Sequence, residues 1–231
     1  MTRARSTDFR PRELARLGAV VFFVLAGLEL VKRCNDTLFR WFPELTEWGV
    51  GGLPYYLLWL VPLGLVALAF PNASETPWAL RRRGRPTIIA AVLGLAVAGL
   101  AHVYWHPLSS LLNGSAHVHW PPRSSTLAWT VALTAPPLVE EWLFRGILWR
   151  SFAGDSEAWP RLLMTLVLTS WLFAVSHLPT MVPGSVEHAT PLLDHLWFGG
   201  VMGVLRWRFR SVLPGVLAHA LCNGLIPLVT W

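Results

Sequence analysis

The sequence PPLVEEWLFRG, residues 136–146, places two adjacent carboxylates and an arginine inside an apolar stretch. The surrounding segment, about residues 126–148, is long and apolar enough to cross a bilayer as a helix. An ionisable side chain within hydrocarbon costs at least about 2.5 kcal/mol, so such residues are rare and mark functional sites by default. We therefore expect Glu140, Glu141 and Arg145 to belong to a polar site inside a membrane helix bundle.

The composition of the whole chain is that of an integral membrane protein. Of its 231 residues, 54% are hydrophobic and only 14% are charged, and 14 are tryptophan, which favours the membrane–water boundary. The net charge is +6, but the arginines lie in short segments between apolar runs. Orientation signals and contacts with anionic lipid explain such arginines better than nucleic acid, which is not expected as a partner.

Seven apolar segments are each long enough, or nearly so, to span a bilayer. They lie at about 14–31, 50–70, 87–105, 126–148, 162–178, 191–205 and 212–231. The first follows an arginine-rich N-terminus and lacks a small-residue cleavage pattern, so it is predicted to be an uncleaved signal anchor. The sequence therefore predicts one all-α, polytopic membrane domain over residues 1–231, with about seven transmembrane helices.

Basic residues support an orientation for this bundle. With the N-terminus in the cytoplasm, 15 of the 19 Lys and Arg residues fall in inner segments, and only Lys32, Arg33, Arg40 and Arg123 fall in outer ones. The positive-inside rule therefore favours an N-terminus inside and a C-terminus outside.

The two adjacent glutamates are predicted to differ. Glu141 and Arg145 are spaced i,i+4, so they share a helix face and can pair, which lowers the cost of burying either charge. Glu140 is turned about 100° away and has Phe144 at i+4. Glu140 is therefore the carboxylate expected to be available for chemistry, such as taking a proton from water.

Two backbone features accompany these side chains. Pro136 and Pro137 lack an N–H donor, so they are expected to bend or open the helix and admit water. Gly199 and Gly203 have a small-xxx-small spacing, which predicts close packing against a neighbouring helix.

Two histidines lie within later apolar segments. His177 follows Phe173 by one turn, and His219 precedes Asn223 at i,i+4. Two neighbouring donors such as His219 and Asn223 can hold an oxyanion in a dry site. Taken alone, His177 also fits an interfacial histidine, and the His219–Asn223 pair also fits interhelical hydrogen bonding. Three polar elements in successive segments favour an active site over packing.

The remaining six histidines, at positions 102, 106, 117, 119, 188 and 195, fall in or beside predicted outer segments. They are expected to be solvated loop residues. The alternation of His117 and His119 leaves a weak outer metal site as the alternative.

The predicted depths of the site residues agree only in part. Counted from the inner ends of their segments, Glu140, His219 and Asn223 lie roughly 8, 7 and 11 residues in, whereas His177 lies roughly 15 in. The mismatch is about 10 Å at 1.5 Å per residue. Either the segment 162–178 is tilted, or its inner end lies nearer residue 165 or beyond.

These residues resemble the three ordered motifs of the CPBP family, also called the Abi or CAAX prenyl protease type 2 family. The motifs read Glu-Glu-x-x-x-Arg, Phe-x-x-x-His and His-x-x-x-Asn, and the chain matches them at residues 140–145, 173–177 and 219–223. The resemblance covers about residues 126–226, which would form the catalytic core. Residues 1–105 would then hold the signal anchor and accessory transmembrane helices. The resemblance implies an intramembrane protease of the glutamic type.

Carried over residue by residue, the resemblance implies that Glu140 is the general base that activates water, with His177 helping to position it. It implies that His219 and Asn223 stabilise the tetrahedral oxyanion. The supporting residues would be Glu141, Arg145 and Phe173.

No metal or other cofactor is required in that scheme. Glu140, His177 and His219 are also a plausible zinc ligand set. They lie on three predicted helices without a His-Glu-x-x-His frame, and this spacing favours metal-free catalysis while leaving zinc open.

The function expected on these grounds is hydrolysis of a peptide bond near a membrane-proximal or C-terminal segment of a membrane-anchored protein or peptide. Maturation of C-terminal sorting signals or of lipidated proteins would fit, and the Arg- and Trp-rich composition favours a bacterial inner membrane. The alternatives are a non-catalytic membrane scaffold or immunity factor and, third, a proton-coupled transporter, which the lack of an internal repeat disfavours.

Overall fold

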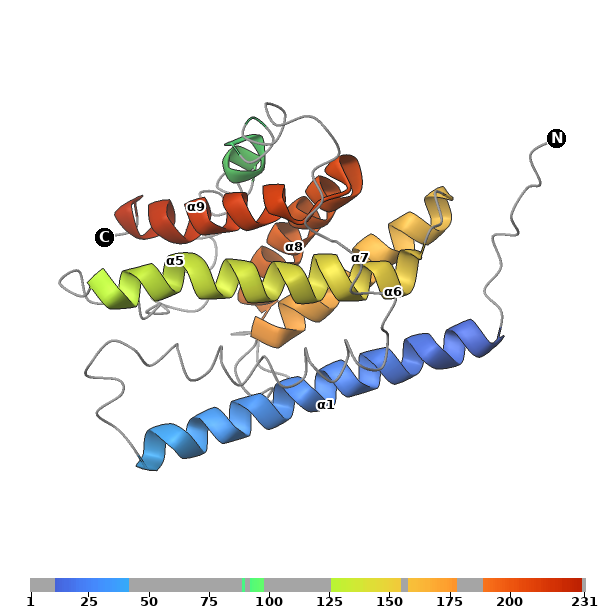
Figure 1. Ribbon diagram of the computed structural model, residues 1–231, viewed down its shortest axis with the longest axis horizontal. Helices are drawn as coiled ribbons and strands as arrows, with labels where there is room; N and C mark the ends of the chain where they lie inside the picture. The colour runs from blue at the N-terminus through green and yellow to red at the C-terminus, as the bar shows by residue number, and fades with distance from the viewer. Residues whose placement is uncertain are drawn as a thin grey trace.

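A computed structural model of the chain describes residues 11–41, 89, 92–97, 126–154, 158–177 and 189–229 (Figure 1). The elements within these ranges are helices, and no strand occurs among them, which confirms the predicted all-α class. They are α1 (Pro11–Trp41), α5 (Thr126–Glu141), the π-helix η2 (Trp142–Leu148), α6 (Trp149–Ala153), α7 (Trp159–His177), α8 (Ala189–Phe209) and α9 (Leu213–Val229).

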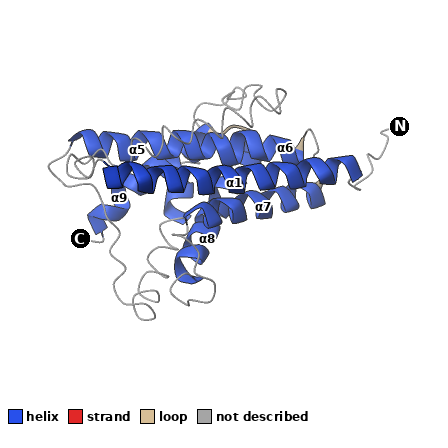
Figure 2. Cartoon of the chain, turned by 90° about the horizontal axis from the view of Figure 1, so that it is seen from below, coloured by secondary structure: helices blue, strands red, loops and turns tan. Residues whose placement is uncertain are grey.

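The central element is a continuous helical rod, defined here as α5, η2 and α6 together, from Thr126 to Ala153. The rod lies beside α9 (Figure 1), and α7 packs more extensively on α8 than any other pair of described helices does. Seen from below, α1 lies in front of the rod and α7 (Figure 2), and it contacts α7. Val20 and Val24 of α1 thereby join Phe144, Phe152 and Leu172 in one apolar core.

Two glycines let α8 approach α7 closely. A Cβ at Gly199 would lie 3.1 Å from the backbone Cα of Ser170, and a Cβ at Gly203 would overlap the side chain of Leu166. Gly200, between them, faces open space. The small residues are therefore required on one face only, which confirms the predicted close-packing role of Gly199 and Gly203.

The outward faces of α7 and α9 are apolar. Exposed apolar side chains recur every four residues on both helices, at Trp159, Leu163, Val167 and Trp171 and at Leu217, Leu221 and Leu225. A helix that faces water carries polar residues on such a stripe, so these faces suit contact with lipid. Among the described residues, one helix, α7, is both long and apolar enough to cross a membrane.

Several helix boundaries differ from prediction. α1 continues to Trp41 rather than ending near residue 31, because Arg33 Nε donates to Glu29 Oε1 at 2.8 Å and keeps both charges on the helix surface. α7 covers 159–177 instead of 162–178, and α8 covers 189–209 instead of 191–205. The segment 50–70 and most of 87–105 lie outside the described residues, so the count of seven spans stays a prediction.

Candidate active site

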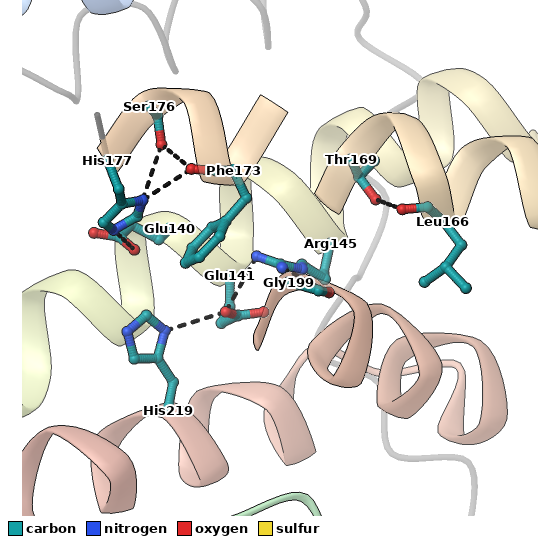
Figure 3. Close-up of polar contacts among 10 residues, drawn as sticks. All are labelled: Glu140, Glu141, Arg145, Leu166, Thr169, Phe173, Ser176, His177, Gly199 and His219. Atoms are coloured by element: carbon teal, nitrogen blue, oxygen red, sulfur yellow. Dashed lines mark hydrogen bonds and ion pairs between the residues drawn. The ribbon is translucent and has the colours of Figure 1, made fainter. Parts of the chain in front are cut away.

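Six of the seven residues singled out from the sequence meet inside the bundle, from three directions (Figure 3). The rod contributes two carboxylates and the arginine, α7 contributes a phenylalanine and a histidine, and α9 contributes a histidine. The seventh, Asn223 of α9, contacts the backbone of α5 instead. Glu140, Glu141, Arg145 and His219 are at most 5% exposed. Burial of this many ionisable groups is tolerated only when they are paired, so their partners decide what each can do.

The two prolines do not interrupt α5, which corrects the expectation that they open the helix there. The helix passes through Pro136 and Pro137 in α-helical form and changes to a π-helix only at Trp142. Pro136 has no N–H to donate to the carbonyl of Ala132, one turn earlier. That carbonyl instead accepts a 3.1 Å hydrogen bond from Nδ2 of Asn223 in α9. Asn223 thus satisfies the backbone group that the proline leaves unpaired.

Glu140 lies against His177. Its Oε2 is 3.4 Å from Nε2 of His177, an ion-pair distance longer than a well-formed hydrogen bond. Nδ1 of His177 lies 2.9 Å from the Phe173 carbonyl, so Nδ1 carries a proton and donates it there. Nε2 is then the ring atom that exchanges protons, and Glu140 and His177 together can hold one proton and accept another. The two side chains predicted to act together on water are therefore neighbours in the structure.

Glu141 serves a different set of partners. Its Oε1 accepts from Nη1 of Arg145 at 3.3 Å and from Nδ1 of His219 at 3.1 Å. Arg145 also donates from Nη2 to the carbonyl of Gly199 at 2.9 Å. The predicted Glu141–Arg145 pair is therefore confirmed, and it extends to α9 through His219 and to α8 through Gly199.

The contact with Glu141 sets the tautomer of His219. A carboxylate paired with arginine is an acceptor, so Nδ1 of His219 must be the donor in this hydrogen bond. Nε2 of His219 then donates to another group only when the ring is doubly protonated. For His219 to donate to an oxyanion from Nε2, its ring must therefore carry both protons while Glu141 accepts from Nδ1.

Phe173 connects the two halves of the site. Its ring centroid lies 4.4 Å from that of His177 and 5.3 Å from that of Phe144, and the Arg145 guanidinium carbon sits 4.5 Å from it. The arginine therefore gains a cation–π contact in addition to its ion pair. The Phe173 ring lies between Arg145 and His177 and separates their charges, which is a physical reason for its predicted supporting role.

His195 corrects one prediction. It was expected to be a solvated loop residue, but it lies in α8 and its ring stacks on His177, with centroids 4.4 Å apart and planes 25° apart. The other five histidines assigned to outer segments lie outside the described residues. The sequence did contain a signal for His195, because this residue lies inside the apolar segment 191–205, close to two glycines.

Arg206 is a second residue that sequence reasoning did not assign to the site. Its Nε donates to the carbonyl of Arg145 at 2.8 Å. Arg145 lies within η2, where the wider π-helical turn changes the backbone pairing that an α-helix would make. Arg206, predicted as an orientation signal, therefore also ties α8 to the backbone of η2.

Helix inclination, not helix length, accounts for the predicted mismatch in depth, because α7 also begins earlier than expected. The rod continues to Ala153 rather than 148, which places Glu140 further from its inner end. α7 begins at Trp159, so its inner end does not lie near residue 165. α7 instead runs obliquely to α5 (Figure 1), and this tilt brings His177 to Glu140.

The arrangement of the donor groups bears on the zinc alternative. Within the described ranges, no three His, Cys, Asp or Glu side chains are grouped to hold a metal ion. Nδ1 of His219 is directed at Glu141, so the three side chains of the zinc alternative, Glu140, His177 and His219, are distributed over two separate pairs.

Comparison with known families locates the site within a matched region. Residues 121–225 match the family model described as type II CAAX prenyl endopeptidase, Rce1-like. This region runs from just before α5 to near the end of α9 and contains all the residues of the candidate site. Searches among curated proteins and among solved structures return no match to the chain.

Proposed function

We propose that this chain hydrolyses peptide bonds with a water molecule that Glu140 and His177 activate. Its residues 121–225 match the Rce1-like type II CAAX prenyl endopeptidase family, which is a family of membrane proteases. The observation that carries the proposal is the pairing of these two side chains. Glu140 is 2% exposed, yet its partner His177 keeps 27% of its side chain exposed. The buried carboxylate of Glu140 therefore lies beside a side chain that water and substrate can reach.

The first step forms the tetrahedral intermediate. Glu140 takes a proton from water, and the water oxygen forms a bond to the carbonyl carbon of the substrate. The carbonyl π electrons move to its oxygen, which becomes an oxyanion. Nε2 of His177 lies 3.4 Å from Oε2 of Glu140, so the ring helps to orient the water and shares the proton.

Asn223 and His219 are the proposed donors to the oxyanion. One N–H of the Asn223 amide is engaged with Ala132, which leaves the second for the oxyanion. His219 donates from Nε2 while Glu141 accepts from Nδ1. Removing one such donor typically costs about 10²–10³ in rate.

The second step breaks the peptide bond. The oxyanion electrons reform the carbonyl, the C–N bond breaks, and the leaving nitrogen takes up the proton held by Glu140 and His177. The enzyme returns to its starting charge. Every group in this cycle is a side chain of the chain itself, so we propose that no metal is needed.

The proposed substrate is a membrane-anchored protein or peptide cut near a membrane-proximal or C-terminal segment, with sorting signals and lipidated C-termini as the two candidate classes. The proposed location is a bacterial inner membrane, with the chain crossing it several times. The apolar outer stripes of α7 and α9 support a lipid-embedded site.

Mapping of membrane-protein termini tests the proposal. Cells lacking the chain are complemented with the wild type or with Glu140→Gln at equal abundance. A new terminus that appears only with the wild type is the expected result, and it also identifies the substrate. Equal rescue of the same phenotype with no change in any terminus would instead establish a scaffold role.

Metal dependence needs a separate measurement. We expect purified protein to contain zinc at well below one equivalent and to keep its activity after dialysis against a chelator. Activity that is lost on chelation and restored by zinc alone would replace the metal-free scheme.

A further inference from the structure

His195 lies outside the three motifs and is an aromatic neighbour of His177, the partner of the proposed base. It projects from α8, half-buried, while His177 ends α7. Their ring centroids are 4.4 Å apart with planes 25° apart, which is a stacked arrangement. The ring of Phe173 also lies 4.4 Å from His177, at 40°.

Hydrogen bonding alone does not fix the plane of the His177 ring. Nδ1 is held by the carbonyl of Phe173 at 2.9 Å and lies 3.2 Å from Oγ of Ser176. Both partners act at Nδ1, whereas the contact of Nε2 with Glu140 is long, at 3.4 Å, so hydrogen bonding holds the Nδ1 side of the ring more closely than the Nε2 side. Nε2, the atom that faces Glu140, is the one that would move.

Two aromatic rings restrict this movement. Phe173 and His195 are 6.2 Å apart, too close to lie on opposite faces of His177, so His177 packs into the corner between them. Phe173 is fully buried and belongs to the same helix as His177. His195 is therefore the contact that fixes the ring from a different helix, α8, where a flat polar ring tolerates partial exposure.

We propose that His195 is a positioning residue, which by stacking holds the His177 ring with Nε2 directed at Glu140. This inference rests on the proposed function, because its consequence is the rate of the step that Glu140 and His177 perform. A stacked aromatic pair contributes about 0.5–1.5 kcal/mol beyond burial. Loss of the ring should therefore lower kcat by about three- to tenfold and leave KM nearly unchanged.

The test compares three substitutions that separate the ring from its polarity. His195→Ala removes both, His195→Gln keeps a polar group without a ring, and His195→Phe keeps a ring without a titrating group. Leu193→Ala is the matched control, since Leu193 lies on α8 two residues earlier and is 45% exposed. Wild type and Glu140→Gln complete the set.

Each protein is purified in detergent and assayed with a quenched-fluorescence peptide that spans the cleavage site found by terminus mapping. We expect kcat to fall with Ala and Gln, and to stay within about twofold of wild type with Phe and with Leu193→Ala. Thermal unfolding of each variant checks that the same amount of protein is folded.

The outcomes separate this inference from the function on which it depends. Equal kcat for Ala and wild type, with Glu140→Gln inactive, overturns the role of His195 alone. If the Phe variant is as slow as the Ala variant while the Gln variant is active, His195 acts through a polar contact and not through stacking. Peptide cleavage by Glu140→Gln at the wild-type rate overturns the proposed function, and the inference with it.

Discussion

Glu140 and Glu141 are neighbours in the chain, yet they belong to two differently built halves of the site. Glu141 is fully enclosed and shares one oxygen between Arg145 and His219. Glu140 has one ionisable partner at short range, His177, at a distance that leaves the contact imperfect. Both halves contain a glutamate and a histidine, but only one of them also contains a fixed positive charge.

The difference shows how one helix can hold a structural carboxylate and a reactive one side by side. Arg145 remains charged under all ordinary conditions, so the half of the site that contains Glu141 keeps a fixed positive charge. His177 can gain or lose a proton, so the charge of the Glu140 half can change during a reaction. The roughly 100° between adjacent helix positions is what directs the two carboxylates to different partners.

Glu140→Gln should give the largest effect on activity. The amide cannot accept the proton of water, so we expect kcat to fall by about 10²–10⁴. The free energy of unfolding should change little, because the amide keeps its shape and His177 is half-exposed. Peptide cleavage and thermal unfolding in detergent, measured on the same preparation, check both statements.

A loss of folded protein with Glu140→Gln would contradict the comparison, because it would make Glu140 a structural residue like Glu141. His177→Gln is the companion variant. It should also retain the fold, since the glutamine amide can still donate to the Phe173 carbonyl.

Arg145→Leu should give the largest effect on stability. It leaves Glu141 buried without its arginine, and breaking a buried pair by removing one partner costs about 3–5 kcal/mol. It also leaves the carbonyl of Gly199 without its donor. We expect little folded protein in the membrane fraction, with an unfolding midpoint in detergent well below that of the wild type.

The double variant Glu141→Gln with Arg145→Leu tests the cause. If the unpaired carboxylate is responsible, removing its charge should recover part of the lost stability. An identical loss in the single and double variants would assign the effect to the cavity left by the arginine instead.

Local spacing made one half of this site predictable. The i,i+4 rule connects Glu141 to Arg145 within a single helix, so the pair required no knowledge of tertiary structure. The pairing of Glu140 with His177 was available only through the order of the motifs, since the two residues lie on different helices and helix inclination decides whether they meet. The all-α class followed from composition alone.

Features that depend on tertiary register were not predictable. The hydrogen bond from Asn223 to Ala132 requires both the loss of a donor at Pro136 and the alignment of α9 with α5. The change to a π-helix at Trp142 carries no sequence signature of its own. His195 was misassigned because it lies only four residues from the expected start of its segment at 191, where a histidine is expected to face solvent.

Asn223→Ala combined with Pro136→Ala should separate the backbone role of Asn223 from its proposed catalytic role. Alone, Asn223→Ala leaves the part-buried carbonyl of Ala132 without this donor, at a cost of up to about 1–3 kcal/mol. Pro136→Ala restores an N–H that can reach this carbonyl within α5. We therefore expect a favourable coupling of at least about 0.5 kcal/mol in the double-mutant cycle, measured by unfolding in detergent.

Activity should not follow stability in this cycle. The double variant should be as slow as Asn223→Ala, because neither change replaces the donor to the oxyanion. Recovery of kcat together with stability would show that Asn223 acts on the reaction only through the backbone of α5.

Gly199→Ala and Gly200→Ala should give the smallest effects, with opposite signs. Both replacements favour the helix by about 0.5–1 kcal/mol, because alanine loses less backbone entropy than glycine. At Gly200 the new Cβ meets nothing within 4 Å, so this gain should appear as a small increase in the unfolding midpoint. At Gly199 the new Cβ would lie 3.1 Å from the backbone Cα of Ser170 and 3.2 Å from Nη2 of Arg145.

Neither neighbour of Gly199 can yield easily, since one is backbone and the other is held by Glu141 and by the Gly199 carbonyl itself. Overpacking of this kind costs about 1–3 kcal/mol, which exceeds the gain from alanine and leaves a net loss of about 1 kcal/mol. The strain acts on the Arg145 half of the site and not on Glu140. We therefore expect Gly199→Ala to lower the unfolding midpoint while kcat per folded molecule stays near that of Gly200→Ala, and a selective fall in kcat would mean that the two halves are coupled through Arg145.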